Sequence, residues 1–380
     1  MIKIKSHKIV LLDSIFDGFI YIENGKIVEV SKEDKPTNDF FDYSSFYVAP
    51  GFIEMHSHGG GGHPFLNGTA DDVVEACNFH LKHGTTSILP TITAAPFEEM
   101  KKATSNIVEA TKSKKLKSNI LGVHLEGPYL SKKQSGAQNL EYIKAPSGNE
   151  YLPFIKEYGE YIRKWTYAPE VDLNQKFVKT LVSNHIIASI GHSDATYLDV
   201  KKAVECGANM VTHLYSCTSS ITRNHGFREL GVTECAYLFD ELSIEIIADA
   251  KHLPPELLKL ILKNKNHNNI VLVSDSLEIA GTNIYEGNMG GTEFIVEDGV
   301  CKLKDRSAFA GSIATDELLV KNIVECGCPI YEAVKMMSYN PARLLGVNKG
   351  IIEPNKDADI VVFNDSFEVC SVFVNGNIVK

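Results

Sequence analysis

Residues 49–62 read APGFIEMHSHGGGG, an apolar run that leads into two histidines and four glycines. The run GFIEM has the length and composition of a buried β-strand. Two histidines separated by one residue on extended backbone point to the same side of the chain. This is the arrangement expected in an enzyme barrel, where reactive side chains gather at the carboxyl ends of the strands.

Seven further apolar runs follow, and successive runs begin roughly 30 residues apart with helical patterns between them. The eight candidate strands are GFIEM (51–55), TSILP (86–90), NILGVHL (119–125), KWTYA (164–168), IIASIG (186–191), NMVTH (209–213), SIEIIAD (243–249) and NIVLVSD (269–275). Helices are predicted at 69–83 and 194–206, and residues 131–163 predict a loop over the barrel mouth followed by a helix. The pattern predicts an α/β fold, a (β/α)8 TIM-like barrel over residues 50–345.

The two ends of the chain have a different texture. Residues 1–49 contain short strands with a hairpin signal at Asn24-Gly25, and residues 346–380 repeat this pattern with Asn375-Gly376. Two β-rich ends around an α/β middle predict that the ends pair into one small β-sandwich domain.

Composition limits the function. The chain has 380 residues and a formal net charge of −10, so its surface offers no bulk attraction to nucleic acid, and an anionic substrate must be held by local cations. No apolar run approaches the ~20 residues that span a bilayer, and the first residues lack a signal-peptide pattern. We therefore expect a cytoplasmic protein without a membrane partner, whose eight cysteines are reduced.

Histidines and carboxylates fall at or just after the ends of the predicted strands. They are His56, His58, Glu126, His192, His213 and Asp275. A single histidine after a strand is more often a hydrogen-bonded loop or core residue. Six such groups that converge at one face of a barrel would be costly to bury without a cation, and imidazole with carboxylate is a ligand set for zinc and other divalent metals.

The chain resembles the amidohydrolase superfamily and, within it, the N-acetylglucosamine-6-phosphate deacetylase family. The resemblance covers essentially the whole chain and rests on APGFIEMHSHGGGG (49–62), HGTTSILPT (83–91), GVHLEGPYL (122–130), YAPE (167–170), GHSDAT (191–196), VTHLYS (211–216), IIADAKH (246–252), VSDS (273–276), FAGS (309–312), SYNPAR (338–343) and KGIIEPNKDADIVVFN (349–364). It implies metal-dependent removal of the acetyl group from N-acetylglucosamine 6-phosphate, with Asp275 as general base and then general acid.

The resemblance also implies a ligand set. Glu126, His192 and His213 match the ligands of the principal metal, and His56 and His58 allow a second ion bridged by Glu126. One or two divalent ions are therefore expected in each subunit. Zinc is the first expectation, and iron, manganese or cobalt would suit the same ligands.

Substrate contacts are implied in the same way. His252 matches a family histidine near the sugar phosphate. Arg223 matches an arginine that the family supplies from the neighbouring subunit, which implies a homodimer, and Arg228 competes for this role. Outside the resemblance, a single arginine in such a loop is more often a solvated surface charge.

The chain departs from the family at three places. Ser216-Cys217-Thr218 stands where the family usually has Asn-Ala-Met against the sugar, and Gln138 stands where it commonly has a histidine that reaches the sugar. The loop SCTSSITRNHGFRELG (216–231) also differs from the usual proline-containing one. These departures leave open another N-acetylhexosamine, phosphorylated or not, an N-acyl amino acid, a cyclic amide or an aminopurine as substrate. A barrel that has lost its chemistry and serves a structural or regulatory role is a third hypothesis, and retention of the six reactive residues counts against it.

Overall fold

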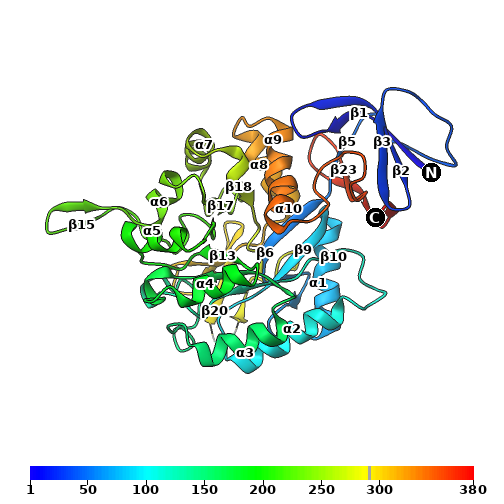
Figure 1. Cartoon of the computed structure of the whole chain (residues 1–380). Coiled ribbons are helices and arrows are strands. Elements are labelled where there is room, and N and C mark those ends of the chain that lie inside the picture. The colour runs from blue at the N-terminus through cyan, green and yellow to red at the C-terminus, as the bar shows by residue number, and fades with distance from the viewer. Residues whose placement is uncertain (290–291) are drawn as a thin grey trace.

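The computed structural model describes residues 1–289 and 292–380, and its largest part is a barrel of parallel strands (Figure 1). Among the described residues the barrel has eight strands in chain order. They are β6 (Phe52–Ser57), β9 (Thr85–Ile92), β11 (Val123–Glu126), β12 (Ile162–Tyr167), β13 (Ile187–Ile190), β14 (Met210–Val211), β17 (Ser243–Ile246) and β18 (Ile270–Leu272). Each strand overlaps one predicted run, which confirms the (β/α)8 prediction.

The third predicted run is broken in the structure. Its first part forms β10 (Asn119–Ile120), which pairs with β9, and its second part forms β11. Gly122 lies between them with φ 143°, and a Cβ atom at this position would lie 2.5 Å from the Tyr161 carbonyl oxygen. Only glycine fits this close approach without strain, so the run cannot continue as one strand.

The barrel closes between its first and last strands. The His58 N–H donates to the Ser276 carbonyl at 2.7 Å, and the Asp275 N–H donates to the His56 carbonyl at 2.9 Å. Ser57 and Ser276 also form a parallel bridge. This seam brings residues from opposite ends of the barrel sequence beside one another.

One helix follows each barrel strand along the chain. These helices are α1 (Ala70–Lys82), α2 (Phe97–Ala110), α3 (Gly148–Tyr158), α4 (Lys176–Ser183), α5 (Tyr197–Glu205), α6 (Val232–Leu238), α7 (Pro255–Asn264) and α8 (Asp316–Glu325), and α9 (Ile330–Met337) and α10 (Tyr339–Leu345) come after them. Helix α5 begins three residues later than predicted. The reason is local, because the Asp199 carboxylate accepts the Thr196 N–H and makes Thr196 the N-cap.

The interior of the barrel has an apolar and a polar part. The apolar part consists of Ile53, Met55, Leu89, Ile187, Met210, Ile247, Val271 and Val273, packed with Ala342 and Leu345 of α10. The polar part includes His124, whose Nε2 lies 2.8 Å from Thr166 Oγ1, which in turn lies 2.8 Å from Thr212 Oγ1. Barrels are usually filled by branched apolar side chains, so buried polar groups here call for a functional explanation.

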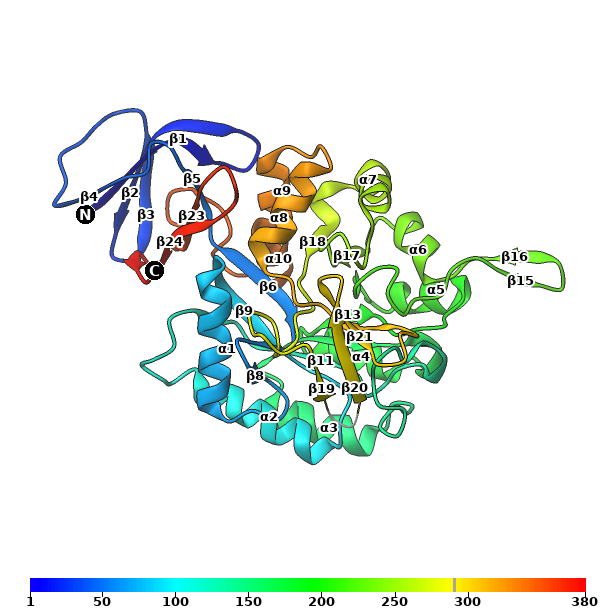
Figure 2. The ribbon, with the colours of Figure 1, turned by 180° about the vertical axis from the view of Figure 1, so that it is seen from behind.

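The two ends of the chain form one sheet beside the barrel (Figures 1 and 2). Its strands are β1 (Ile2–Val10), β2 (Ile15–Glu23), β3 (Lys26–Ser31), β4 (Asp39–Asp42), β5 (Tyr47–Pro50), β23 (Ile360–Phe363), β24 (Val369–Val374) and β25 (Asn377–Ile378). Phe41 of β4 meets Phe373 of β24 edge to face with ring centroids 5.3 Å apart. In the sheet order, β23 and β5 lie between β24 and β1, and β4 pairs with β1. The contact between β4 and β24 therefore shows that the sheet is curled, and it encloses a hydrophobic core of its own. We propose residues 1–49 and 346–380 as this domain and 50–345 as the barrel domain.

Smaller strands lie at the edges of the barrel. The hairpin of β15 (Thr222–Asn224) and β16 (Phe227–Glu229) projects away from the barrel (Figure 2). A four-stranded sheet follows β18 and consists of β19 (Glu286–Met289), β20 (Thr292–Glu297), β21 (Val300–Leu303) and β22 (Phe309–Gly311), and β7 (Gly59–Gly60) pairs with β8 (His63–Pro64). Within the described residues, no helix has the length and apolar character needed to cross a membrane.

Candidate active site

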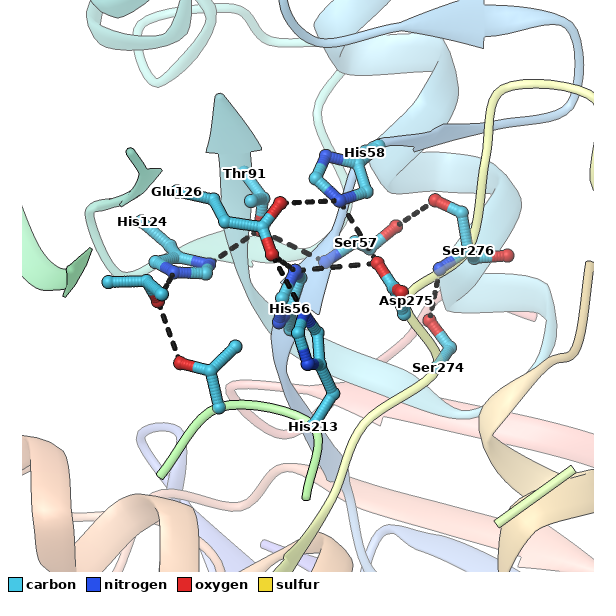
Figure 3. A network of polar contacts seen from close by, with 12 residues as sticks. His56, Ser57, His58, Thr91, His124, Glu126, His213, Ser274, Asp275 and Ser276 are labelled. Carbon is cyan, nitrogen blue, oxygen red and sulfur yellow. Dashed lines mark hydrogen bonds and ion pairs between the residues drawn. The ribbon is translucent and has the colours of Figure 1, made fainter. Parts of the chain in front are cut away.

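The six predicted reactive residues meet at the carboxyl ends of the barrel strands. Figure 3 shows five of them, His56, His58, Glu126, His213 and Asp275. Five of them line one cavity of about 480 Å³: His58, Glu126, His192, His213 and Asp275. His56 is completely buried at the end of β6, and its ring meets that of His58 with centroids 5.2 Å apart. The structure therefore places all six side chains in one cluster.

Three of these residues sit on strained backbone. His192 has φ 46°, His213 has φ 26° and Asp275 has φ 50°, which puts each in the left-handed region. Residues other than glycine seldom adopt such angles, and each instance costs of the order of 1–3 kcal/mol. Each of the three comes two or three residues after the end of a short strand, and its side chain lines the cavity.

Glu126 is the centre of the cluster. Its Oε1 lies 3.1 Å from His192 Nε2, 3.0 Å from His213 Nε2 and 3.4 Å from His56 Nε2. Its Oε2 lies 3.4 Å from His58 Nε2. Asp275 completes the group, because its Oδ1 lies 3.0 Å from His58 Nε2 and 3.4 Å from His56 Nε2.

Hydrogen bonds orient the imidazoles of His192 and His213. His192 Nδ1 lies 2.9 Å from the Gln134 carbonyl oxygen, and His213 Nδ1 lies 3.1 Å from that of Ser216. A carbonyl can only accept, so each Nδ1 carries the proton, and each Nε2 can present a lone pair to a metal.

This arrangement fits a divalent metal. The ligand atoms of Glu126, His192 and His213 lie within 4.8 Å of one another, and so do those of His56, His58 and Glu126. Among the described residues, His56 Nε2 and His58 Nδ1 are buried without a hydrogen-bond partner. Buried polar atoms are normally satisfied, and a cation between these ligands would account for His56 Nε2. The cluster could thus hold one ion or two, with Glu126 shared.

The electrostatics of the cluster are consistent with a cation. Burial acts to lower the pKa of His56, but the charges of Glu126 and Asp275 outweigh it and raise this pKa to about 10. Burial likewise opposes ionisation of Asp275, yet His56 and His58 lower its pKa to about 2. The carboxylates are therefore anions at neutral pH, and the balancing positive charge sits on imidazole protons that a divalent ion would displace.

Four of the predicted substrate contacts line the same cavity: His252, Ser216, Cys217 and Gln138. His252 Nδ1 lies 2.7 Å from Asp249 Oδ2, which leaves Nε2 as the ring nitrogen that can meet a ligand. Gln138 is already engaged, because its Nε2 donates to Glu126 Oε2 at 2.8 Å and its Oε1 accepts the Ala94 N–H at 3.0 Å. In this structure Gln138 orients Glu126, a contact that the sequence did not predict.

Arg223 and Arg228 lie elsewhere. They face each other on the exposed hairpin of β15 and β16 and do not line the cavity of their own chain. Among the described residues that line this cavity there is no lysine or arginine.

Sequence reasoning missed two groups of residues. Tyr142 and Asn139 line the cavity from a loop whose sequence carries no recognisable motif, and Phe309 lines it from the start of β22. Lys164 and Glu245 form a buried ion pair inside the barrel. For this pair a signal was available, because Lys164 opens the predicted strand KWTYA and Glu245 interrupts the apolar run of SIEIIAD.

Known proteins resemble the chain in sequence and in fold. The sequence model of the Amidohydrolase family matches residues 47–379. The N-acetylglucosamine-6-phosphate deacetylase of Lysinibacillus sphaericus is 32% identical over 91% of this chain and 89% of that protein, and that of Haemophilus influenzae is 33% identical over 95% of each. The Mycobacterium smegmatis enzyme of the same name, solved in complex with N-acetyl-D-glucosamine-6-phosphate, superposes with TM-score 0.92 at 26% identity and covers 99% of this chain and 98% of that one.

The barrel, its cluster of histidines and carboxylates, and these matches define a class of protein. The chain belongs to the amidohydrolase family, with N-acetylglucosamine-6-phosphate deacetylases as its curated relatives. The resemblance read from the sequence is thus confirmed at the level of the family.

Proposed function

We propose that the chain hydrolyses the acetamide of N-acetylglucosamine 6-phosphate, which yields glucosamine 6-phosphate and acetate. The observation that carries the proposal is the Glu126 carboxylate shared between two candidate metal triads with Asp275 beside it. Relatives with this activity in their names match nearly the full chain. Convergence of all six reactive residues counts against a barrel that has lost its chemistry.

The ligand set suits zinc, and iron, manganese or cobalt fit it as alternatives. Glu126, His192 and His213 would hold the principal ion, and His56 and His58 would join Glu126 around a second. When bound, such an ion acts as a Lewis acid towards the amide carbonyl and the attacking water. A cytoplasmic location fits the eight cysteines, all of which are unpaired.

Asp275 is positioned to move the protons of the reaction. As an anion it accepts a proton when a water molecule adds to the carbonyl carbon of the amide. The same proton is then delivered to the leaving nitrogen as the C–N bond breaks, so that the amine departs neutral. Asp275 Oδ1 lies 3.0 Å from His58 Nε2, so the carboxylate stands beside the proposed ligands of the second ion.

The phosphate is proposed to bind between His252 and Arg223 of a partner subunit in a homodimer. The cavity has no arginine of its own among its described lining residues, whereas Arg223 is exposed on a hairpin that projects from the barrel (Figure 2). On the same hairpin the side chain of Phe227 is 79% exposed, and Ile221, which directly precedes β15, is 53% exposed. A homodimer in which this hairpin meets the partner would cover both side chains.

The test is acetate release from a panel of acetamides by protein loaded with zinc. The panel contains N-acetylglucosamine 6-phosphate, its galactosamine and mannosamine epimers, the unphosphorylated sugars and an N-acetyl amino acid. We expect the highest kcat/KM for N-acetylglucosamine 6-phosphate. Preference for any other member would overturn the substrate assignment, and no turnover of any amide would overturn the reaction itself.

A further inference from the structure

A lysine and a glutamate pair across the interior of the barrel. Lys164 lies on β12 and Glu245 on β17, and β13 and β14 separate these strands. Both side chains are fully shielded from solvent, and Lys164 Nζ donates to Glu245 Oε1. Burying two charges is costly unless the geometry is good and the remaining hydrogen-bonding positions are used. The pair therefore needs a purpose beyond filling the barrel.

The other oxygen of Glu245 reaches the metal site. Glu245 Oε2 lies 3.2 Å from His56 Nδ1, so the carboxylate accepts the Nδ1 proton. With Nδ1 engaged, His56 Nε2 faces Glu126 Oε1 and Asp275 Oδ1, each 3.4 Å away. A carboxylate behind the far nitrogen of an imidazole is how proteins fix the tautomer and the ring angle of a metal-binding histidine.

Lys164 fixes the carboxylate in turn. A charge-assisted hydrogen bond from Lys164 to one carboxylate oxygen fixes the plane of the carboxylate and directs its other oxygen at His56. His192 and His213 rely on backbone carbonyls for the same purpose. His56 differs from them because it is oriented by a buried side-chain pair.

We propose that Lys164 and Glu245 are positioning residues for His56, which they hold in the tautomer and orientation needed to bind the second divalent ion with His58 and Glu126. This inference rests on the proposed function insofar as that function includes a second ion. Loss of an outer partner of a metal-binding histidine typically weakens metal binding by about 10–100-fold. The expected effect is confined to the second ion.

The test compares three variants with the wild-type protein. Glu245→Gln removes the charge that holds His56, and the double variant Lys164→Met/Glu245→Leu removes the whole pair without leaving a lone buried charge. Apolar replacement of a complete buried pair often preserves stability, so the double variant guards against a failure to fold. Lys349→Met is the matched control, because it breaks a buried Lys–Asp pair in the terminal sheet, where Lys349 Nζ lies 2.7 Å from Asp359 Oδ2.

The measurement is a titration of metal-free protein with cobalt(II), followed by the visible absorption of the bound ion and by metal analysis after dialysis. Two ions per subunit are expected in the wild type and in Lys349→Met. The double variant and Glu245→Gln should bind the first ion as the wild type does and the second about 10–100-fold more weakly. Two ions bound by the double variant with wild-type affinities would overturn the inference.

Acetate release by the zinc-loaded wild type, measured alongside, separates this inference from the proposed function. A wild type that turns over the sugar phosphate but binds only one ion overturns the positioning role and leaves deacetylation standing. A wild type that binds two ions, loses the second in the double variant and fails to cleave the sugar phosphate upholds the positioning role and overturns the substrate.

Discussion

Two regions of the molecule bury clusters of charge, and they do so in opposite ways. In the terminal sheet, Lys349 Nζ lies 2.7 Å from Asp359 Oδ2 and 2.9 Å from Asp357 Oδ2. The second oxygen of Asp359 accepts the Asn375 N–H at 2.7 Å. Each buried charge in this region meets a partner within the chain, so the cluster needs nothing from outside.

The cluster at the barrel mouth lacks this balance. Glu126 is surrounded by imidazoles, yet His56 Nε2 is buried without a hydrogen bond among the described residues. His192 and His213 stand on strained backbone that places them there. The comparison teaches that buried charge alone is no sign of a functional site. A functional site is better indicated by ligand atoms that converge on one point and find no hydrogen-bond partner within the chain.

Removal of metal is expected to have the largest effect. Dialysis against a chelator should abolish acetate release, because the barrel cluster depends on a cation that the chain does not supply. Addition of zinc should restore it. If protein that metal analysis shows to be metal-free keeps full activity, the contrast between the two clusters is wrong. The barrel cluster would then need no cation, like the charge cluster around Lys349.

Replacement of Asp275 by asparagine comes next. The amide keeps the shape of the side chain but can neither accept nor deliver the proton, so kcat should fall by about 10³-fold. The principal ion should remain, because its proposed ligands are Glu126, His192 and His213. Steady-state kinetics and metal analysis on one preparation check both points, and near-normal turnover would refute the role of Asp275.

Loss of Arg223 should have a more selective effect. Arg223→Ala is expected to raise KM for the phosphorylated sugar about 10–100-fold, the range of one charge-assisted hydrogen bond, and to leave KM for the unphosphorylated sugar almost unchanged. Arg228→Ala, directly opposite on the hairpin, is the matched control and should affect neither. If Arg228→Ala raises KM for the phosphorylated sugar more than Arg223→Ala does, Arg228 and not Arg223 is the phosphate ligand. Equal effects of Arg223→Ala on both sugars would exclude phosphate binding.

The smallest effect on activity is expected in the terminal sheet. Lys349→Met leaves Asp359 buried without its cation and should lower the free energy of unfolding by about 3–5 kcal/mol. The folded fraction should keep its kcat/KM and its metal content, as measured below the melting transition. A loss of metal in this variant would show that the two clusters are coupled.

Much of the fold and of the site could be predicted because the signals are local. Apolar runs and the helical segments between them predicted every barrel strand, and His56, Glu126 and Asp275 could be placed at strand ends by counting. Where a predicted strand or helix differed from the observed one, the cause was also local, but the hydrophobic pattern does not show it. Gly122 splits the third run, and the Thr196 cap delays helix α5.

Contacts between distant side chains could not be predicted in this way. Gln138 was predicted as a substrate contact, and its hydrogen bond to Glu126 was not predicted. Arg223 was assigned by resemblance alone, and its place on a projecting hairpin depends on how that loop folds. Both results depend on the path of a loop, which local sequence constrains only weakly.

The sequence by itself determined the order of strands and helices and the chemical groups at the strand ends, because periodicity and residue type act over a few positions. The tertiary structure alone decided how these groups are held: which nitrogen of each histidine faces Glu126, and that Lys164 and Glu245 meet behind His56. Closure of the barrel brings these strands together, and this contact is made only in the folded chain.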